Sequence, residues 1–353
     1  MGAVAKEITN YELRIANSAE IKNLKSKIEI DTIYFGGGTP SLLKPKQLEK
    51  ILEEVYKKFS VAENSEITME MNPATVTIET LKDYKRSGVN RASFGAQTFD
   101  DTELKRLGRR HTAADVRETI ELLRNADFQN VSFDLIAGLP RQTLKDWERN
   151  LDEALKLNPE HISLYLLEVH EGTPLAEQIK SERQPLPDED LASEMYLLML
   201  EKLAAKNYEQ YEISNFSRAG FESRHNSKYW KFAPYFSFGV SAHSFDGANS
   251  RWSNDRDTFS YVKKIENNES PIIETIKLDE DSRRSEYAFL KLRLNEGIDL
   301  DEYEKNFGVD LADKFAEDLA RLEEAGLIEL TEKNLRLTKK GMIFSNEVFS
   351  VFV

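Results

Sequence analysis

The chain contains no cysteine among its 353 residues. This absence excludes disulfide bonds, thiol nucleophiles and metal or iron–sulfur sites held by thiolates. Histidine is also scarce, with five residues, so a metal site would have to use these and carboxylates. The sequence has neither an apolar run of the ~18 residues that a membrane helix needs nor the apolar core of a signal peptide. We therefore predict a cytoplasmic protein without a transmembrane segment.

Positive charge is outnumbered by negative charge. The chain has 48 Lys and Arg against 62 Asp and Glu, which gives a net charge of −14 and an isoelectric point of about 5.1. Such a balance disfavours non-specific binding to nucleic acid or anionic lipid. Hydrophobic residues make up 40% and charged residues 31%, as is typical of a globular chain. The length favours about two domains.

Five β-rich runs alternate with amphipathic helical segments in the first half of the chain. Helix starts are marked by the spacing of Thr112 with Asp115 and of Thr143 with Asp146, which is typical of a capping box. Repeated strand–helix units predict parallel strands joined by crossover helices, and both a doubly wound sheet and a TIM-like barrel fit. The predicted strands cover residues 31–35, 66–71, 91–95, 131–136 and 161–167.

The second half of the chain has a different composition. Residues 214–257 are rich in Ser, Asn, Gly and aromatics, and predict long functional loops around a short strand near 236–242. From residue 282 the pattern is helix, helix and then two short strands near 328–330 and 335–337, which resembles a winged-helix module. Residues 301–353 carry 12 acidic and 7 basic side chains, which argues against DNA binding by this module.

These changes in composition predict three parts: a (β/α) domain over residues 1–208, an aromatic loop segment over 209–275, and a small packing domain over 276–353. A further helix is predicted over residues 1–27, where Val4, Ile8, Tyr11, Leu13 and Ile15 are apolar.

A glycine-rich turn follows the first predicted strand in the segment YFGGGTP, residues 34–40. Glycines let the backbone approach a ligand closely and expose N–H groups, although tight turns of this kind also occur without a ligand. Polar side chains stand at the ends of the next strands, and the C-terminal ends of parallel strands meet at one edge of a sheet, where α/β folds bind ligands. These side chains are Glu70, Asn72, Gln97, Asp134 and Glu168.

Four motifs in one order resemble a known family: DTIYFGGGTPSLL at 31–43, MEMNP at 69–73, NRASFGAQTF at 90–99 and FDLIAGLP at 133–140. The chain is similar, from about residue 28 onward, to the radical S-adenosylmethionine (SAM) family of oxygen-independent coproporphyrinogen III oxidases and their haem-chaperone relatives. The resemblance implies an α/β fold, an incomplete parallel (β/α) barrel of the radical SAM type, followed by the small winged-helix-like α+β domain.

The resemblance also implies a SAM pocket. The amine, carboxylate and ribose hydroxyls of this cofactor suit carboxylate, cationic and amide partners. Arg109 belongs to a small basic cluster with Arg110 and His111 and has an alternative interpretation as a solvated charge at a helix end. The residues implied to bind SAM are Gly37, Gly38 and Thr39 at the methionyl end, with Glu70, Gln97, Arg109 and Asp134 completing the pocket.

The segment RHNSKYW, residues 224–230, resembles the HNxxYW signature of the haem-chaperone branch. This resemblance implies that His225 is a ligand of haem iron and that Tyr229 and Trp230 stack on the porphyrin, since imidazole binds iron well and aromatic rings pack on porphyrin faces. His243 is a second candidate ligand. Without the resemblance, a histidine in an aromatic loop is more often a packed or surface residue.

The chain departs from this family in one respect. The family holds a [4Fe–4S] cluster with a CxxxCxxC loop after its first strand, and no such strand or loop precedes residue 31. Because residues 1–27 resemble the family's first helix, we expect the gene to encode roughly 40–50 further codons upstream in frame, the length of one strand, its loop and part of a helix. The alternative is a true loss of the radical chemistry.

Three functions are therefore open. The first is a haem chaperone that binds haem and SAM and delivers haem to acceptor haemoproteins. The second is an oxygen-independent coproporphyrinogen III oxidase, which carries out a radical SAM decarboxylation in porphyrin biosynthesis. The third is a non-catalytic protein that binds SAM or a tetrapyrrole. The sequence makes no prediction of the oligomeric state or of the haem acceptor.

The missing thiolates generate a first prediction. The 353-residue chain should stay colourless after anaerobic incubation with iron and sulfide, and should form no 5′-deoxyadenosine from SAM under dithionite, because no cysteine is present to hold the cluster. Absorption spectroscopy and product analysis check both outcomes. Brown protein that cleaves SAM would show that other side chains hold a cluster.

Overall fold

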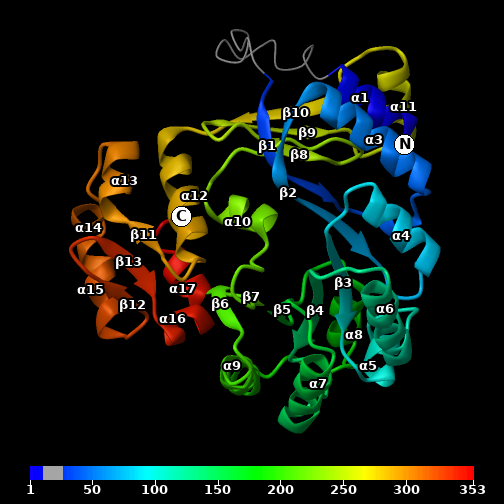
Figure 1. Ribbon diagram of the computed structural model, residues 1–353. Coiled ribbons are helices and arrows are strands. Elements are labelled where there is room, and N and C mark those ends of the chain that lie inside the picture. The colour runs from blue at the N-terminus through cyan, green and yellow to red at the C-terminus, as the bar shows by residue number, and fades with distance from the viewer. Residues whose placement is uncertain (11–26) are drawn as a thin grey trace. The chain divides into compact units, whose positions relative to one another are not determined.

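A computed structural model describes residues 1–10 and 27–353 (Figure 1). Two compact units divide the chain: the first unit comprises Met1–Ile33, Leu43–Glu66 and Arg224–Val353, and the second comprises Tyr34–Leu42 and Ile67–Ser223. Helix α1 (Gly2–Thr9) lies within the helix expected over residues 1–27 and ends at Thr9 with Asn10 as its C-cap; residues 11–26 of that expected helix lie outside the described residues. The division at residues 208 and 275 stays a prediction.

The main sheet has seven strands in the order β1-β2-β3-β4-β5-β7-β6. Strands β2 to β5 are parallel, whereas β7 runs antiparallel to β5, and β6 antiparallel to β7. Because the first five strands follow chain order with no reversal, the sheet lacks the switch point of a doubly wound fold, and the incomplete barrel is confirmed. The strands are β1 (Glu29–Phe35), β2 (Ser60–Met71), β3 (Arg91–Gln97), β4 (Val131–Ala137), β5 (His161–Leu166), β6 (Glu209–Glu212) and β7 (Asn215–Ser217).

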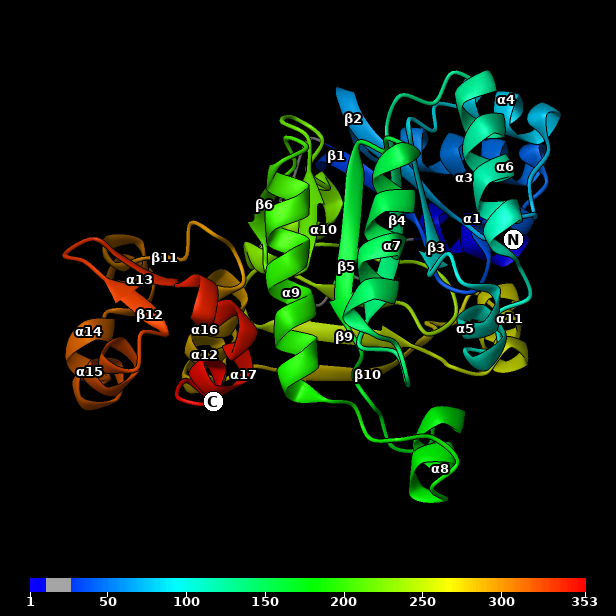
Figure 2. The ribbon, with the colours of Figure 1, turned by 90° about the horizontal axis from the view of Figure 1, so that it is seen from below.

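Helices connect the strands. Both predicted capping boxes are confirmed, since Thr112 and Asp115 cap α6 reciprocally and Thr143 and Asp146 cap α7. In the second unit α6, α7 and α9 run alongside β4 and β5 (Figure 2). The helices are α3 (Pro45–Lys58), α4 (Ile78–Arg86), α5 (Asp101–Arg106), α6 (Ala113–Asn125), α7 (Leu144–Lys156), α8 (Pro174–Lys180) and α9 (Glu189–Ala204), with a short 3-10 helix η2 (Pro40–Leu42).

The two faces of β2 to β5 differ in polarity. Side chains alternate between faces along a strand, and one face carries the buried apolar residues Met69, Phe94, Phe133 and Leu164. The register places polar residues side by side on the opposite face. Parallel strands that are covered on both faces are normally apolar throughout, so a buried polar face indicates a surface kept for a ligand. We call these residues the polar face: Thr68, Glu70, Arg91, Ser93, Ser132, Asp134, His161 and Ser163.

A second sheet belongs to the first unit and contains β8 (His243–Phe245), β9 (Ser250–Asn254) and β10 (Ile272–Lys277), all antiparallel. The prediction of a strand near 236–242 was wrong, because Gly239 and Ser241 have φ angles of +115° and +58°, which interrupt an extended backbone. The strand begins instead at His243. Helix α10 (Arg224–Trp230) precedes these strands in the chain, and helix α11 (Thr258–Glu266) lies between β9 and β10.

The C-terminal module confirms the two short strands, but four helices precede them where two were predicted. Strand β13 pairs antiparallel with both β12 and β11, and β11 was missed because it has only two residues. No helix within residues 1–10 and 27–353 is long and apolar enough to cross a membrane. The module contains α12 (Glu280–Leu292), β11 (Ile298–Asp299), α13 (Leu300–Phe307), α14 (Leu311–Lys314), α15 (Ala316–Glu324), β12 (Ile328–Leu330), β13 (Asn334–Leu337), α16 (Lys339–Ile343) and α17 (Ser345–Phe349).

Candidate functional site

The glycine-rich turn after β1 is held by the carboxylate of Glu70. The Gly37 N–H donates to Glu70 Oε2 at 3.0 Å, and the Tyr34 hydroxyl donates to Oε1 at 2.8 Å. Gly37 and Gly38 have φ angles of +78° and +65°, a region that favours glycine. A Cβ at Gly36 would lie 2.7 Å from the Tyr34 ring, so only a glycine lets the backbone of the turn pass this close to that ring. Burial and the Glu70 carboxylate raise the pKa of Tyr34, which keeps its hydroxyl a donor.

Thr39 completes the turn. Asn72, just past the end of β2, donates from Nδ2 to Thr39 Oγ1 at 3.0 Å. The turn residues Gly37 and Thr39 are therefore tied to the end of β2 at two points, once through Glu70 and once through Asn72.

Gln97 ends β3 in a strained conformation. A β-bulge lies between Gly95 and Gln97, and Gln97 has a φ angle of +66°. Its side chain is buried and lies directly over Gly95, where any Cβ would collide with the Gln97 amide. The partner of Gly95 across the ladder is Asp134, so the bulge brings the Gln97 side chain to the strand that carries Asp134. Strain of this kind is typical of positions that hold a ligand.

Asp134 is the most perturbed acid of this group. Burial raises the pKa of Asp134 to about 6, against the lowering effects of a hydrogen bond from Ser163 and of the positive charges of Arg91 and Arg109, and Glu70 adds to the rise. The carboxyl is thus close enough to Glu70 and Arg109 to feel both charges. It is mainly ionised at pH 7 and can then accept hydrogen bonds.

Two residues at the strand ends stand apart. Arg109 is exposed, and no hydrogen bond or ion pair joins its side chain to another residue of the described chain, although its charge lowers the pKa of Asp134. Glu168 lies beyond the end of β5, is exposed, and has its Oε2 3.6 Å from His170 Nε2. The structure therefore gathers Gly37, Thr39, Glu70, Gln97 and Asp134, with Arg109 at the edge and Glu168 outside the group.

Helix α10 carries the aromatic motif and is fixed at its start by two carboxylates of the first unit. The buried Glu66 accepts hydrogen bonds from the backbone N–H groups of Arg224 and His225, both at 3.0 Å. Asp31 on β1 pairs with Lys228 at 2.7 Å and with Arg224 at 3.3 Å. These contacts hold the histidine of the motif against β1.

The imidazole of His225 is half-buried, and both of its nitrogens are hydrogen-bonded. Nδ1 lies 3.0 Å from Thr32 Oγ1, and Nε2 lies 3.0 Å from the Tyr229 hydroxyl. The rings of His225 and Tyr229 meet edge to face with centroids 5.4 Å apart, and Tyr229 meets Tyr235 at 4.7 Å. His225 thus stands in an aromatic cluster with its ring orientation set from two sides.

Trp230 and His243 have different surroundings. The Arg293 guanidinium stacks 4.3 Å from the centre of the Trp230 ring, and the buried indole nitrogen has no hydrogen-bond partner in the described residues. His243 begins β8 and is exposed. Within residues 1–10 and 27–353, no contact joins His243 to His225, so the structure brings Tyr229 but not His243 to this imidazole.

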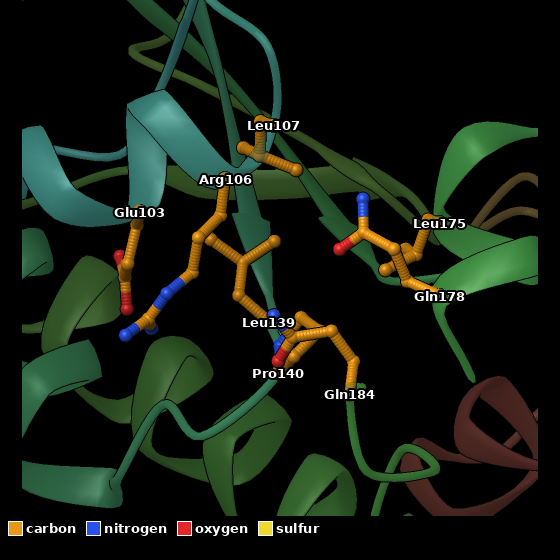
Figure 3. Close-up of a pocket in the computed structure, with 8 residues that line it drawn as sticks. All are labelled: Glu103, Arg106, Leu107, Leu139, Pro140, Leu175, Gln178 and Gln184. Atoms are coloured by element: carbon orange, nitrogen blue, oxygen red, sulfur yellow. The ribbon is translucent and has the colours of Figure 1, made fainter. Parts of the chain in front are cut away.

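A small cavity of the second unit lies away from these residues (Figure 3). Apolar side chains from the ends of α5 and β4 and from α8 form most of its wall. The buried Glu103 is bonded to Thr98 and, at 3.2 Å, to Gln142, and burial raises its pKa. Its carboxyl already has two partners, so the cavity offers no free acid.

Sequence reasoning missed two residues of these groups. Arg91 stands on the polar face six residues before Gln97, and Thr32 binds His225. The sequence did contain a signal for Arg91. Every second residue of a strand faces the same way, so the spacing along β3 predicts one face for Arg91, Ser93, Gly95 and Gln97. Thr32 gave no local signal, since its partner lies 193 residues away in the chain.

Comparison with known families gives two matches. The model of the radical SAM superfamily matches residues 16–154, and the model of the HemN C-terminal domain matches residues 278–344. The second range contains most of the C-terminal module.

Curated relatives are similar over most of the chain. It is 37% identical over 326 residues to the heme chaperone HemW of Bacillus subtilis (strain 168), a match that covers 92% of this chain and 86% of the relative. It is 34% identical over 336 residues to the heme chaperone HemW of Lactococcus lactis subsp. lactis, covering 95% and 86%. The mitochondrial radical S-adenosyl methionine domain-containing protein 1 of Bos taurus is 33% identical, covering 89% and 73%.

Among solved structures, the chain is similar to the coproporphyrinogen III oxidase (HemN) of Escherichia coli, a radical SAM enzyme. The TM-score is 0.80 at 23% sequence identity, and the match covers 99% of this chain and 82% of the other. At this identity the likeness shows a shared fold.

The raised pKa of Asp134 generates a stability prediction. The native carboxyl binds its proton more tightly than the unfolded one, whose pKa is 3.8, so ionisation destabilises the fold as the pH rises from about 4 to about 6. Asp134→Asn should therefore have a higher free energy of unfolding than the wild type at pH 7, and the same value near pH 4. Denaturant unfolding across this pH range measures the difference.

Asp115→Asn is the matched control with the opposite sign. Hydrogen bonds from Thr112 lower the pKa of Asp115, so this substitution should reduce stability at pH 7. A loss of stability at pH 7 in Asp134→Asn as well would contradict the prediction and assign Asp134 a structural role.

Proposed function

The chain belongs to the heme chaperone HemW family of radical SAM proteins, and we propose that it binds haem and delivers it to acceptor haemoproteins. The observation that carries this proposal is the geometry of His225 in α10, within the segment RHNSKYW. The imidazole is held by one neighbour on each nitrogen, and one of these neighbours can turn away.

The Nε2 atom of His225 is the proposed ligand of the haem iron. Both partners are hydroxyls, so either tautomer satisfies both contacts; in the tautomer proposed to bind iron, Nδ1–H donates to Thr32 Oγ1, and Nε2 accepts from the Tyr229 hydroxyl. Rotation of the Tyr229 hydroxyl then frees the Nε2 lone pair for iron, while Thr32 keeps the ring in place. A hydrogen bond on the other ring nitrogen is the usual way in which a protein orients a ligating histidine.

The aromatic residues beside His225 supply the packing surface. Tyr229 and Trp230 carry flat rings that suit a porphyrin face. The Arg293 guanidinium covers one face of the Trp230 ring and so fixes the plane of that ring. Haem is the cargo in this proposal. His243 remains a second candidate ligand, because its exposed imidazole lies on another strand of the same unit.

The group at the strand ends fits the polar atoms of SAM. Gly37, Gly38 and Thr39 are proposed to receive its methionyl end, with Glu70 for the amine, and Gln97, Arg109 and Asp134 for its carboxylate and ribose hydroxyls. When bound to a reduced cluster, this cofactor supplies radical chemistry. The ionised carboxylate of Asp134 is a stronger acceptor of hydrogen bonds from hydroxyls than the neutral acid, and burial raises its pKa to about 6, so we expect this contact to weaken below that pH.

The residues of this chain do not fit a [4Fe–4S] cluster. The chain has no cysteine, and no group of three or more His, Asp and Glu in the described residues is placed to hold a metal ion. We therefore derive no step through the cluster.

The oxidase alternative is favoured only by the shared fold. The likeness to HemN stands at 23% identity, whereas the chaperone relatives reach 37% over most of their length. A test for loss of propionate carboxyls from coproporphyrinogen III separates this function from haem delivery. The third candidate, a non-catalytic protein that binds SAM or a tetrapyrrole, would use the same residues: those at the strand ends for SAM and those around His225 for the tetrapyrrole.

Haem titration tests the proposal. The wild-type chain should bind haem stoichiometrically with a shift of the Soret band, and His225→Ala should abolish the shift because the iron ligand is lost. Tyr229→Phe should bind haem equally or up to roughly tenfold more tightly, since it removes a competing hydrogen bond of about 1 kcal/mol but keeps the ring. Thr32→Val should weaken binding by freeing the imidazole ring.

Trp230→Ala should weaken haem binding less than His225→Ala, because it removes packing area and leaves the ligand. His243→Ala is the control and should titrate like the wild type. Equal titrations for the wild type and His225→Ala would remove the reason for assigning the haem site to α10.

A further inference from the structure

The polar face contains a buried arginine that the proposed SAM and haem contacts do not use. Arg91 is the first residue of β3 and is only 1% exposed. Its Nε has no hydrogen-bond partner, and no carboxylate in the described ranges forms an ion pair with it. Burying a charged group without a partner is strongly unfavourable, so native proteins pair such groups or place them against a ligand.

Another buried polar atom without a partner lies beside it. Thr68 on β2 is the ladder neighbour of Arg91 and is fully buried, and its Oγ1 has no partner in the described chain. Two unsatisfied polar side chains on neighbouring strands point to a missing hydrogen-bonding group.

Another arginine of the same unit shows the contrast. Arg124 is more exposed than Arg91, yet it donates to both Glu160 oxygens at 2.9 Å and to the carbonyls of Phe128 and Asn158. Arg91 is more buried and has none of these contacts.

The charge of Arg91 acts on the proposed ligand residues. It lowers the pKa values of Asp134 and Tyr34. His161 on the same face cannot add a charge, because burial and the proximity of Arg91 hold its pKa well below 6.5. Arg91 thus supplies the deep positive charge of the polar face.

We propose that Arg91 binds a carboxylate of a ligand held against the polar face, with the Thr68 hydroxyl as an additional donor. The planar fork of a guanidinium matches a carboxylate with two parallel hydrogen bonds, which a lysine cannot reproduce. This proposal deepens the proposed function and rests on it for the choice of ligand. The carboxylate is that of the amino-acid end of SAM, whose other proposed contacts lie in the same unit as Arg91.

The first experiment uses the smallest probe and requires neither SAM nor haem. Sodium propionate should raise the melting temperature of the wild-type chain above that in sodium chloride of equal ionic strength, and should not do so in Arg91→Met. Arg91→Lys should keep part of the shift, because it retains the charge but loses the fork. Equal shifts in the wild type and Arg91→Met, or no shift in the wild type, would overturn the proposal.

The unliganded variants give a second, independent outcome. Arg91→Met should melt at the wild-type temperature or above it, since an unpaired buried charge is removed. Arg124→Met is the matched control and should melt lower, because it breaks a paired arginine. A decrease in Arg91→Met like that in Arg124→Met would make Arg91 a structural counter-charge and overturn the proposal.

A further pair of ligands tests the source of the carboxylate. The wild type should bind SAM roughly 10- to 100-fold more tightly than decarboxylated SAM, and Arg91→Met should lose this preference. A chain that binds no haem but shows the Arg91-dependent propionate shift would refute the chaperone function and leave the carboxylate site standing.

Discussion

The constraint on which the rest of this structure depends is the alternation of side chains in strands β2 to β5. Because every second residue faces the same way, apolar residues such as Phe94 and Phe133 collect on one face and polar residues collect on the other. The apolar face supplies the hydrophobic burial that stabilises the unit. The polar face is buried as well, and it contributes donors and acceptors in place of a second core.

Residues on the polar face and at its rim are held in unfavourable states. Gln97 has a left-handed backbone, Asp134 is an acid whose burial raises its pKa, and Arg91 is a buried cation without an ion pair in the described residues. Purely structural acids of the same chain are satisfied, as Glu66 is by two backbone N–H groups of α10. Such a contrast between unsatisfied and satisfied groups is expected where ligand binding, and not the stability of the fold, decides which residue type stands at a position.

The two candidate sites use different physical means. The SAM residues are polar groups brought together by the ends of successive strands, and the haem residues lie within one short helix and the strand next to it. Each site lies within one compact unit of the chain, the first in the second unit and the haem residues in the first. Loss of one site by mutation therefore need not remove the other.

The sequence by itself determined the features whose information is local. Strand and helix periodicity, the two capping boxes and the motifs containing Gly37, Glu70 and His225 all depend on neighbours a few residues apart, and from them the barrel, the C-terminal module and the family were predicted. Local pattern failed near residues 236–242, where positive φ angles at Gly239 and Ser241 prevent a strand.

Only the tertiary structure decided which groups meet. Thr32 reaches His225 across 193 residues, and Arg91 is identified as unpaired only when all its neighbours are known. The physical reason is that hydrogen bonds and burial act through space, so a side chain's partners depend on how distant strands pack.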